Sequence, residues 1–213
     1  MKKTLYFLLI LCISTSLYSQ EVPNKSSLSL KVLGGLSANF QYGTEINLFG
    51  VQPALQLRTS KNHIHQLAVS NLGIGRGWSR SGDNNRFNLS LAYEYLAPLS
   101  LFRQDDFLQA YLGFGLDASM YSYSFDPDFS NLYNRAQTTY FNRIYLLPLI
   151  QKKINERLFL EFALPVYWGE WQIVKTRNED PSLSPELQRN EWSNAELFFG
   201  RYMSFRIGFG VNL

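Results

Sequence analysis

The charged residues whose spacing could support chemistry fall at alternate positions of segments with an apolar opposite face. In 86–95, for example, Arg86 and Glu94 share one face, and Leu91 lies on the other. Charges gathered inside a closed sheet would be buried and would have to be paired and hydrogen-bonded. We therefore expect a structural core of ion pairs; the alternative is a path for protons or small ions. The residues assigned to this lumen polar core are Lys31, Arg58, Arg86, Glu94, Asp117, Arg143, Glu161 and Arg206.

Metal and acid–base chemistry finds little support elsewhere in the sequence. The only histidines, His63 and His65, share a strand face beside a predicted tight turn, but no further ligand type clusters around them. Asp126 and Asp128 have a calcium-ligand spacing, yet no Gly or terminal Glu follows in register. We interpret the histidines as polar residues at a strand start and the aspartates as a solvated loop. The sequence thus predicts no catalytic residue, metal site or cofactor.

The segments that must position these charges are strands with a repeat of two residues. The clearest is Met203 to Leu213, where Phe205, Ile207 and Phe209 alternate with polar or small residues such as Arg206. The predicted strands are 28–42, 51–58, 63–72, 86–95, 108–120, 138–150, 158–168 and 203–213. Eight is an even number of strands, as single-chain bacterial barrels require.

The predicted connections differ between the two ends of these strands. Long polar loops are expected at 73–85, 125–137 and 173–192, and short turns at 60–62 and 151–156. Short turns on the periplasmic side and long loops outside are typical of outer-membrane barrels.

Two strands depart from a simple pattern. Pro148 and Pro165 cannot donate to a neighbouring strand, so we predict a bulge or a break at each. Apolar residues occupy both faces of 138–150 beyond Ile144, which leaves the inward face of that strand, and the direction of Arg143, open.

The first residues have the pattern of a secretory signal peptide. Lys2 and Lys3 precede an apolar run from Leu5 to Ile13, followed by small polar residues. We predict cleavage after Ser19, with Ser16 as the alternative, which divides the chain into a signal peptide (1–19) and a barrel (20–213).

The composition excludes several other classes of protein. Lys2 and Lys3 supply two of the net charge of +3, and a remainder near +1 gives no support for a nucleic-acid partner. No later segment approaches about 18 consecutive apolar residues, so we exclude a helical membrane protein. The only cysteine, Cys12, lies in the predicted leader. Aromatic residues make up 15% of the chain, which suits a transmembrane barrel.

Taken together, the eight alternating segments, the loop lengths and the apolar C-terminal strand resemble the small OmpA/OmpX-type outer-membrane barrels. The resemblance implies an all-β, eight-stranded antiparallel transmembrane up-and-down β-barrel in the outer membrane. It also implies that the insertion machinery recognises Met203 to Leu213 and that the lipid bilayer surrounds a monomer. The expected role is non-enzymatic: a structural component, or surface recognition of an extracellular protein or glycan through the long outer loops.

Two alternatives remain open at this stage. An outer-membrane lipid-modifying enzyme, a lipid A hydrolase or acyltransferase, would need a histidine near a serine and an acid at the outer edge. A secreted lipocalin-like lipid carrier would turn its apolar face inward. Small residues on the polar face, including Gly115 and Gly208, suit a tight lumen better than a solvated exterior.

Overall fold

The computed structural model describes residues 26–39, 45–79, 82–99, 108–127, 133–200 and 202–213. The predicted signal peptide lies outside these residues. The strands and one short helix, in chain order, are β1 (Ser27–Asn39), β2 (Glu45–Arg58), β3 (Ile64–Ser79), β4 (Gly82–Pro98), β5 (Leu108–Pro127), β6 (Arg135–Lys153), β7 (Leu158–Ala163), β8 (Val166–Asn178), α2 (Pro185–Gln188), β9 (Arg189–Leu197) and β10 (Tyr202–Asn212).

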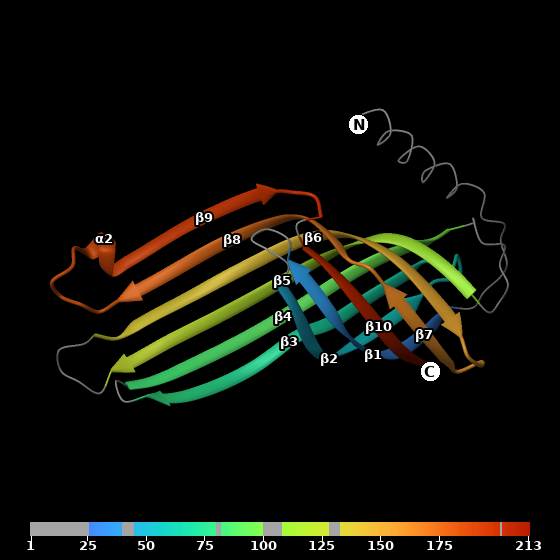
Figure 1. Cartoon of the computed structure of the whole chain (residues 1–213), viewed down its shortest axis with the longest axis horizontal. Coiled ribbons are helices and arrows are strands. Elements are labelled where there is room, and N and C mark those ends of the chain that lie inside the picture. The colour runs from blue at the N-terminus through green and yellow to red at the C-terminus, as the bar shows by residue number, and fades with distance from the viewer. Residues whose placement is uncertain (1–25, 40–44, 80–81, 100–107, 128–132, 201) are drawn as a thin grey trace.

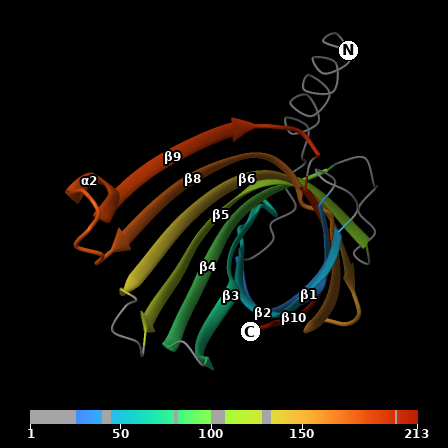
Figure 2. The same cartoon turned by 60° about the vertical axis from the view of Figure 1, so that its left-hand side comes forward.

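These elements form one antiparallel sheet that closes on itself. Each strand from β1 to β6 pairs with the next, and β10 pairs with both β7 and β1. β7 and β8 are two parts of one wall strand, because both pair with β6. β9 and β10 likewise form one wall strand, lying against β8 and β7 respectively. The ten strand segments therefore build the eight-stranded barrel expected from the sequence, and Figure 2 shows its closed ring.

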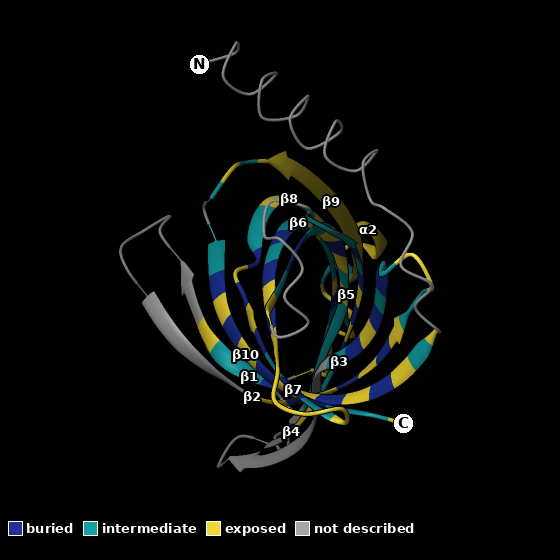
Figure 3. Cartoon of the chain, turned by 90° about the vertical axis from the view of Figure 1, so that its right-hand side faces the viewer, coloured by how far each residue is buried: buried dark blue, intermediate teal, exposed yellow. Residues whose placement is uncertain are grey.

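The barrel is polar inside and apolar outside. On β1, Leu30 and Val32 are exposed while Lys31 is buried, and on β10 Ile207 is exposed while Arg206 is buried. Figure 3 shows this alternation of buried and exposed residues along the strands. An exposed apolar band around a closed sheet needs lipid as its solvent, and a closed barrel satisfies its backbone groups internally. The chain is therefore a transmembrane β-barrel of the outer-membrane type, as the sequence predicted.

None of the helices in the described part of the chain is long and apolar enough to cross a bilayer.

Several strands continue well past the closed ring. β5 has 20 residues and β6 has 19, whereas a strand needs only about 9–11 residues to span a bilayer. In Figure 1 β3 to β6, β8 and β9 extend together to the left of the ring. We call this extension the outer sheet; it consists of the described residues 72–79, 82–88, 121–127, 135–142 and 169–197.

The outer sheet corrects the prediction of long extracellular loops. Residues 73–79 and 82–85 are strand, β5 continues to Pro127, and most of 173–192 belongs to β8 and β9. Cross-strand backbone hydrogen bonds hold these segments although glycine, asparagine and charged residues are frequent in them, so their composition did not distinguish them from loops.

The two prolines behave differently from each other. β7 ends at Ala163 and β8 begins at Val166, so the predicted break at Pro165 is confirmed. β6 runs through Pro148 without interruption, so the prediction of a break there is wrong. The carbonyl of Pro148 still accepts a hydrogen bond from Leu164 N–H at 3.0 Å, beside the break in the neighbouring strand.

The inward face of β6 is now clear. Tyr145, Leu147 and Leu149 are buried inside, while Ile144 and Ile150 are exposed outside. The lower interior therefore contains a hydrophobic cluster, and this explains why the lower half of β6 is apolar on both faces. Its members are Ile64, Leu96, Tyr111, Tyr145, Leu147, Leu149 and Ala163.

Candidate functional site

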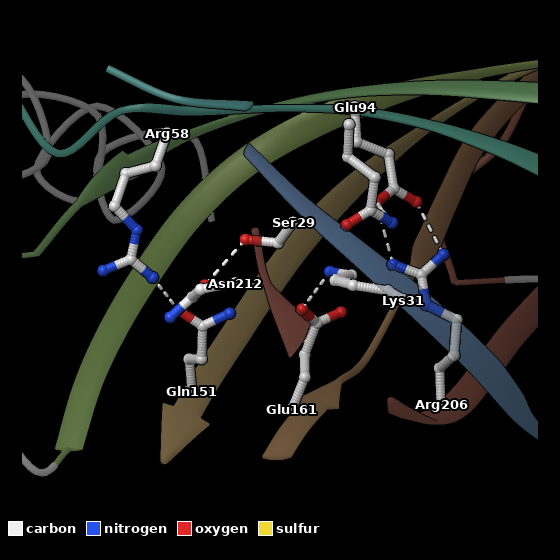
Figure 4. Close-up of polar contacts among 9 residues, drawn as sticks. Ser29, Lys31, Arg58, Glu94, Gln151, Glu161, Arg206 and Asn212 are labelled. Carbon is white, nitrogen blue, oxygen red and sulfur yellow. Dashed lines mark hydrogen bonds and ion pairs between the residues drawn. The ribbon is translucent and has the colours of Figure 1, made fainter. Parts of the chain in front are cut away.

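The centre of the barrel interior is a bidentate ion pair between Glu94 on β4 and Arg206 on β10. Arg206 Nη1 donates to Glu94 Oε1 at 2.6 Å, and Nη2 donates to Oε2 at 2.9 Å (Figure 4). Tyr145 Oη donates to Glu94 Oε1 at 2.7 Å, and Gln66 Nε2 donates to Oε2 at 2.8 Å. The carboxylate of Glu94 thus receives four hydrogen bonds, a geometry that compensates for taking its charge out of water.

A second ion pair lies next to the first. Lys31 on β1 and Glu161 on β7 form a salt bridge, and their side chains are 0% and 1% exposed (Figure 4). The two pairs together contain two acids and two bases, so the buried group is neutral overall. Each pair joins strands distant in sequence, since Lys31 and Glu161 are 130 positions apart and Glu94 and Arg206 are 112 apart.

Arg58 lies below these pairs, towards the periplasmic end. Its guanidinium donates to Gln109 Oε1 at 2.8 Å and to the side-chain oxygen of Gln151 (Figure 4). It also lies 5.9 Å from the centre of the Tyr111 ring. Arg58 therefore faces the interior as predicted, but its hydrogen-bond partners are neutral amides.

Asp117 and Arg143 lie above the buried pairs. They are direct register partners on β5 and β6, yet each contacts a different group. Asp117 Oδ1 accepts from Ser90 Oγ at 2.8 Å and from Ser119 Oγ at 3.0 Å. Arg143 Nε donates to Glu170 Oε2 at 2.5 Å.

The placement of Arg86 differs from the prediction. Its side chain is exposed, and its guanidinium lies 5.9 Å from the centre of the Tyr123 ring. At this height β4 belongs to the outer sheet, beyond the closed ring. Arg86 is therefore not part of the buried core.

A cavity of about 370 Å³ lies directly above the Glu94–Arg206 pair. Arg206, Tyr145 and Ser204 contribute to its lining, and so do Asp117 and Arg143. The buried ion pairs below form a floor of fixed side chains. The interior therefore combines a sealed centre with a hollow directed towards the outer sheet.

Three residues of this interior were missed at the sequence level. Tyr145 lies on the strand whose inward face the pattern left open, and Glu170 follows the bulge beside Gly169, which shifts the alternation of β8. Gln66 lies on the polar face of a weakly patterned strand, so the sequence could assign it to the inner face. Nothing in the sequence, however, indicated Glu94 as its hydrogen-bond partner.

The histidines contact tyrosines at the periplasmic end. His63 Nδ1 lies 2.6 Å from Tyr95 Oη, and His65 Nδ1 lies 2.8 Å from Tyr93 Oη. The pKa of the His63 imidazole is lowered by partial burial, and the positive charges of His65 and Lys61 lower it further. The described residues contain no group of three His, Cys, Asp or Glu placed to hold a metal ion. Asp128 and the side chain of Asp126 lie outside the described part of the chain.

The sequence matches no protein-family model, and a search of curated proteins gives no match. Among solved structures, the chain is similar to a major outer membrane protein from Thermus thermophilus, with 15% identity, a TM-score of 0.47, and coverage of 89% of this chain and 100% of that one. It is also similar to the outer membrane protease OmpT from Escherichia coli, with 9% identity, a TM-score of 0.46, and coverage of 92% and 97%. A third is Ail, the attachment invasion locus protein of Yersinia pestis, with 10% identity, a TM-score of 0.38, and coverage of 88% and 97%.

With TM-scores below 0.5 these likenesses carry no argument about family or activity. The closure of the sheet, its apolar exterior and its ion-paired interior are the grounds for a conclusion. On those grounds this chain is a small eight-stranded β-barrel of the outer membrane.

Proposed function

We propose that this protein is a non-enzymatic, monomeric outer-membrane barrel that binds an extracellular protein through its outer sheet. The observation that carries the proposal is the length of the strands. β5 and β6 continue for about nine residues beyond what a bilayer requires, so they hold a preformed surface outside the membrane. A surface fixed by backbone hydrogen bonds loses less conformational entropy on binding than a flexible loop would.

The chemistry of the β8–β9 hairpin supports a protein partner. All residues of β9 are exposed, and Trp192 and Leu197 on this strand are 46% and 86% exposed. Leu187 at the tip of the hairpin is 61% exposed. Exposed tryptophan and arginine beside apolar groups are typical of the residues that dominate binding energy at protein interfaces.

The charged residues of the hairpin form only surface pairs. Lys175 lies 3.2 Å from Glu191, and Arg177 lies 2.9 Å from Glu179, with all four side chains at least 43% exposed. Exposed pairs of this kind contribute roughly 0–1 kcal/mol, so a partner can replace them at little cost. They would then serve to orient the partner more than to stabilise the fold.

The arrangement of the interior supports a non-enzymatic role. The buried charged residues form ion pairs with one another, Glu94 with Arg206 and Lys31 with Glu161. Both histidines contact tyrosines at the end of the barrel opposite the outer sheet. For insertion we propose that the apolar outer face of β10, with Phe205, Ile207 and Phe209, is the feature that the insertion machinery recognises.

Shortening the hairpin tests the proposal. Val174 and Trp192 are register partners, so Lys175 to Glu191 can be replaced by an Asn-Gly turn without changing the pairing below. A matched control keeps the length of the hairpin but changes Ser182 and Ser184, both at its tip, to alanine. Intact cells that display each variant would be exposed to extracellular proteins, and the proteins that bind to each variant would be captured and compared.

The expected result is that the shortened barrel still inserts and shifts on a gel after boiling, but loses a partner that the control retains. If wild-type, control and shortened barrels capture the same extracellular proteins, the outer sheet is not the binding surface.

A further inference from the structure

The cavity above the Glu94–Arg206 pair is lined by Asp117 and Arg143, whose hydrogen-bonding groups are only partly used by the described residues. Below it, each charged group of the two buried pairs has an oppositely charged partner. In the cavity, both hydroxyl donors to Asp117, from Ser90 and Ser119, reach the same oxygen, Oδ1. Among the described residues, nothing donates to Oδ2.

The guanidinium of Arg143 is in the same situation. Its Nε donates to Glu170, while both Nη groups have no hydrogen bond within the described part of the chain. Its Cζ lies 5.2 Å from the centre of the Phe141 ring and 5.8 Å from that of Tyr202, which fixes the plane of the group. The wall thus offers a carboxylate oxygen and a set of N–H donors on adjacent strands, each already held in place by other contacts.

Apart from Arg206 on the floor, the remaining lining is neutral and includes two kinds of group that suit a polar ligand. Hydroxyl and amide groups come from Ser90, Ser119, Ser204, Gln52 and Asn88. Aromatic rings come from Tyr121, Phe141, Tyr145 and Tyr167. The volume of about 370 Å³ lies within the usual range of small-molecule sites, and the few convergent polar groups are typical of them.

We propose that this cavity is a binding site for a saccharide, either a free monosaccharide or the terminal sugar of a glycan. A sugar presents hydroxyls that both donate and accept, which matches one free carboxylate oxygen, one free guanidinium edge and several hydroxyls. Its C–H faces pack against aromatic rings. A free anion would interact favourably only with the guanidinium of Arg143, and a free cation only with the carboxylate of Asp117.

The floor makes this a site of binding and not of passage. Tyr145 and Arg206 line the cavity from below, and both hydrogen-bond to Glu94, which is 0% exposed. A ligand would therefore enter and leave by the outer end. None of the lining residues lies in the segment 175–191 that the shortened hairpin lacks, so the cavity can be tested whether or not that segment binds a protein.

Saturation-transfer NMR on the full-length refolded barrel tests the proposal. The protein is held in a phosphocholine detergent, because a detergent with a sugar headgroup would compete. The probes are methyl glucoside, methyl galactoside and N-acetylglucosamine, with glycine and methyl phosphate for comparison, since both carry C–H protons that can receive saturation. The expected result is transfer to at least one sugar and none to glycine or methyl phosphate.

Asp117→Asn is the diagnostic variant, since it removes the charge and keeps the shape. A hydrogen bond to a charged group is worth enough that sugar affinity should fall about tenfold or more. Asp180→Asn is the matched control, because it makes the same change on the connection after β8, away from the cavity, and should leave affinity unchanged. Equal affinity in wild type and Asp117→Asn would overturn the proposal, as would a response to methyl phosphate or glycine alone.

A second measurement does not depend on the folding of a variant. Ala92 lines the cavity and is 4% exposed, so its methyl group in the wild-type barrel reports on occupancy. Its methyl resonance should shift as the sugar is added, while that of Ala163, buried in the lower cluster, should stay in place. Sugar transfer without a shift at Ala92 would place the sugar elsewhere and exclude this cavity.

Discussion

Gly115 and Tyr145 lie opposite each other on β5 and β6, and the tyrosine ring occupies the space where a Cβ of residue 115 would stand. An added Cβ would overlap Cζ and the hydroxyl of Tyr145. The ring cannot easily move, because its hydroxyl donates to the buried Glu94. A missing side chain on one strand thus positions a hydrogen bond to the central ion pair.

Gly115→Ala should therefore destabilise the barrel. Overpacking of a buried site costs typically about 1–3 kcal/mol, and displacing the ring also weakens its hydrogen bond to Glu94. The free energy of unfolding in lipid vesicles, measured by denaturant titration, checks this. Gly34→Ala is the control, because nothing lies within 4 Å of the added Cβ there. Equal stability of the two variants would contradict the close approach of ring and backbone.

Glu94→Gln should be one of the most destabilising single changes in the interior. It leaves the guanidinium of Arg206 buried without a counter-charge, and breaking a buried pair in this way costs about 3–5 kcal/mol. Glu191→Gln makes the same substitution in an exposed pair with Lys175, where a loss below about 1 kcal/mol is expected. The comparison uses the same unfolding titration, and similar losses in both variants would show that Glu94 is not a buried counter-ion.

Leu116→Arg tests which face meets lipid. Leu116 is 49% exposed on the outer face of β5, and an arginine in the middle of a bilayer costs about 2–4 kcal/mol in a barrel, less towards either interface. Leu187→Arg, at an exposed site outside the closed ring, should change stability little. The fraction of protein that stays folded in lipid vesicles measures the effect of each substitution on stability. An unaffected Leu116→Arg barrel would place that face away from lipid.

The sealed interior predicts that the barrel conducts no ions. An eight-stranded barrel is only wide enough to be filled by side chains, and the two buried pairs occupy its centre. Planar bilayers containing the purified protein should therefore show no stable channel of porin size. A sustained open level in wild-type protein would mean that the pairs do not close the lumen.

His63 should make the periplasmic end sensitive to acid. Partial burial lowers the pKa of its imidazole below the usual value of about 6.5, so the unfolded chain takes up a proton at a higher pH than the folded one. His63 contributes its full stabilisation above the pKa that its imidazole has in the unfolded chain. This contribution is lost as the pH falls from there through the lower pKa of the folded protein. NMR titration of the imidazole gives the pKa directly. His63→Gln should lose less stability than wild type as the pH falls from about 7.5 to about 5, and equal losses would rule His63 out.

The sequence predicts the closed part of the barrel well because each strand there separates lipid from a polar interior. β1, β4, β5 and β10 show the predicted faces, with residues such as Leu30, Leu91, Leu116 and Phe209 outside. Polarity alternates only where the two sides of the sheet differ. Much of the outer sheet is rich in glycine, asparagine and charged residues, so the composition of these strands resembles that of loops.

The candidate site was predictable in its members but not in its pairing. The alternation put Lys31, Glu94, Glu161 and Arg206 on the inner face, but which acid meets which base depends on strand order and stagger. Arg143 illustrates this: it lies directly opposite Asp117 on β5 and Glu170 on β8, and the bulge in β8 beside Gly169 sets the register in which its guanidinium pairs with Glu170. Arg86 shows a different error. The alternation assigned it to the polar face of its strand, but the sequence did not show that this part of β4 extends beyond the closed ring.

The pairing of β1 with β10 also determines the order in which the molecule can assemble. Ser29 and Asn212, which hydrogen-bond across this junction, are separated by 183 positions, so the seam joins two segments that are made far apart in time. Until β10 arrives, Glu94 has no Arg206, and β1 and β7 each lack a neighbour. A truncated copy would therefore carry unpaired edges and an unneutralised carboxylate together. Both defects would disfavour its entry into lipid, because a bilayer offers no partner to an unpaired strand edge or to an unneutralised carboxylate.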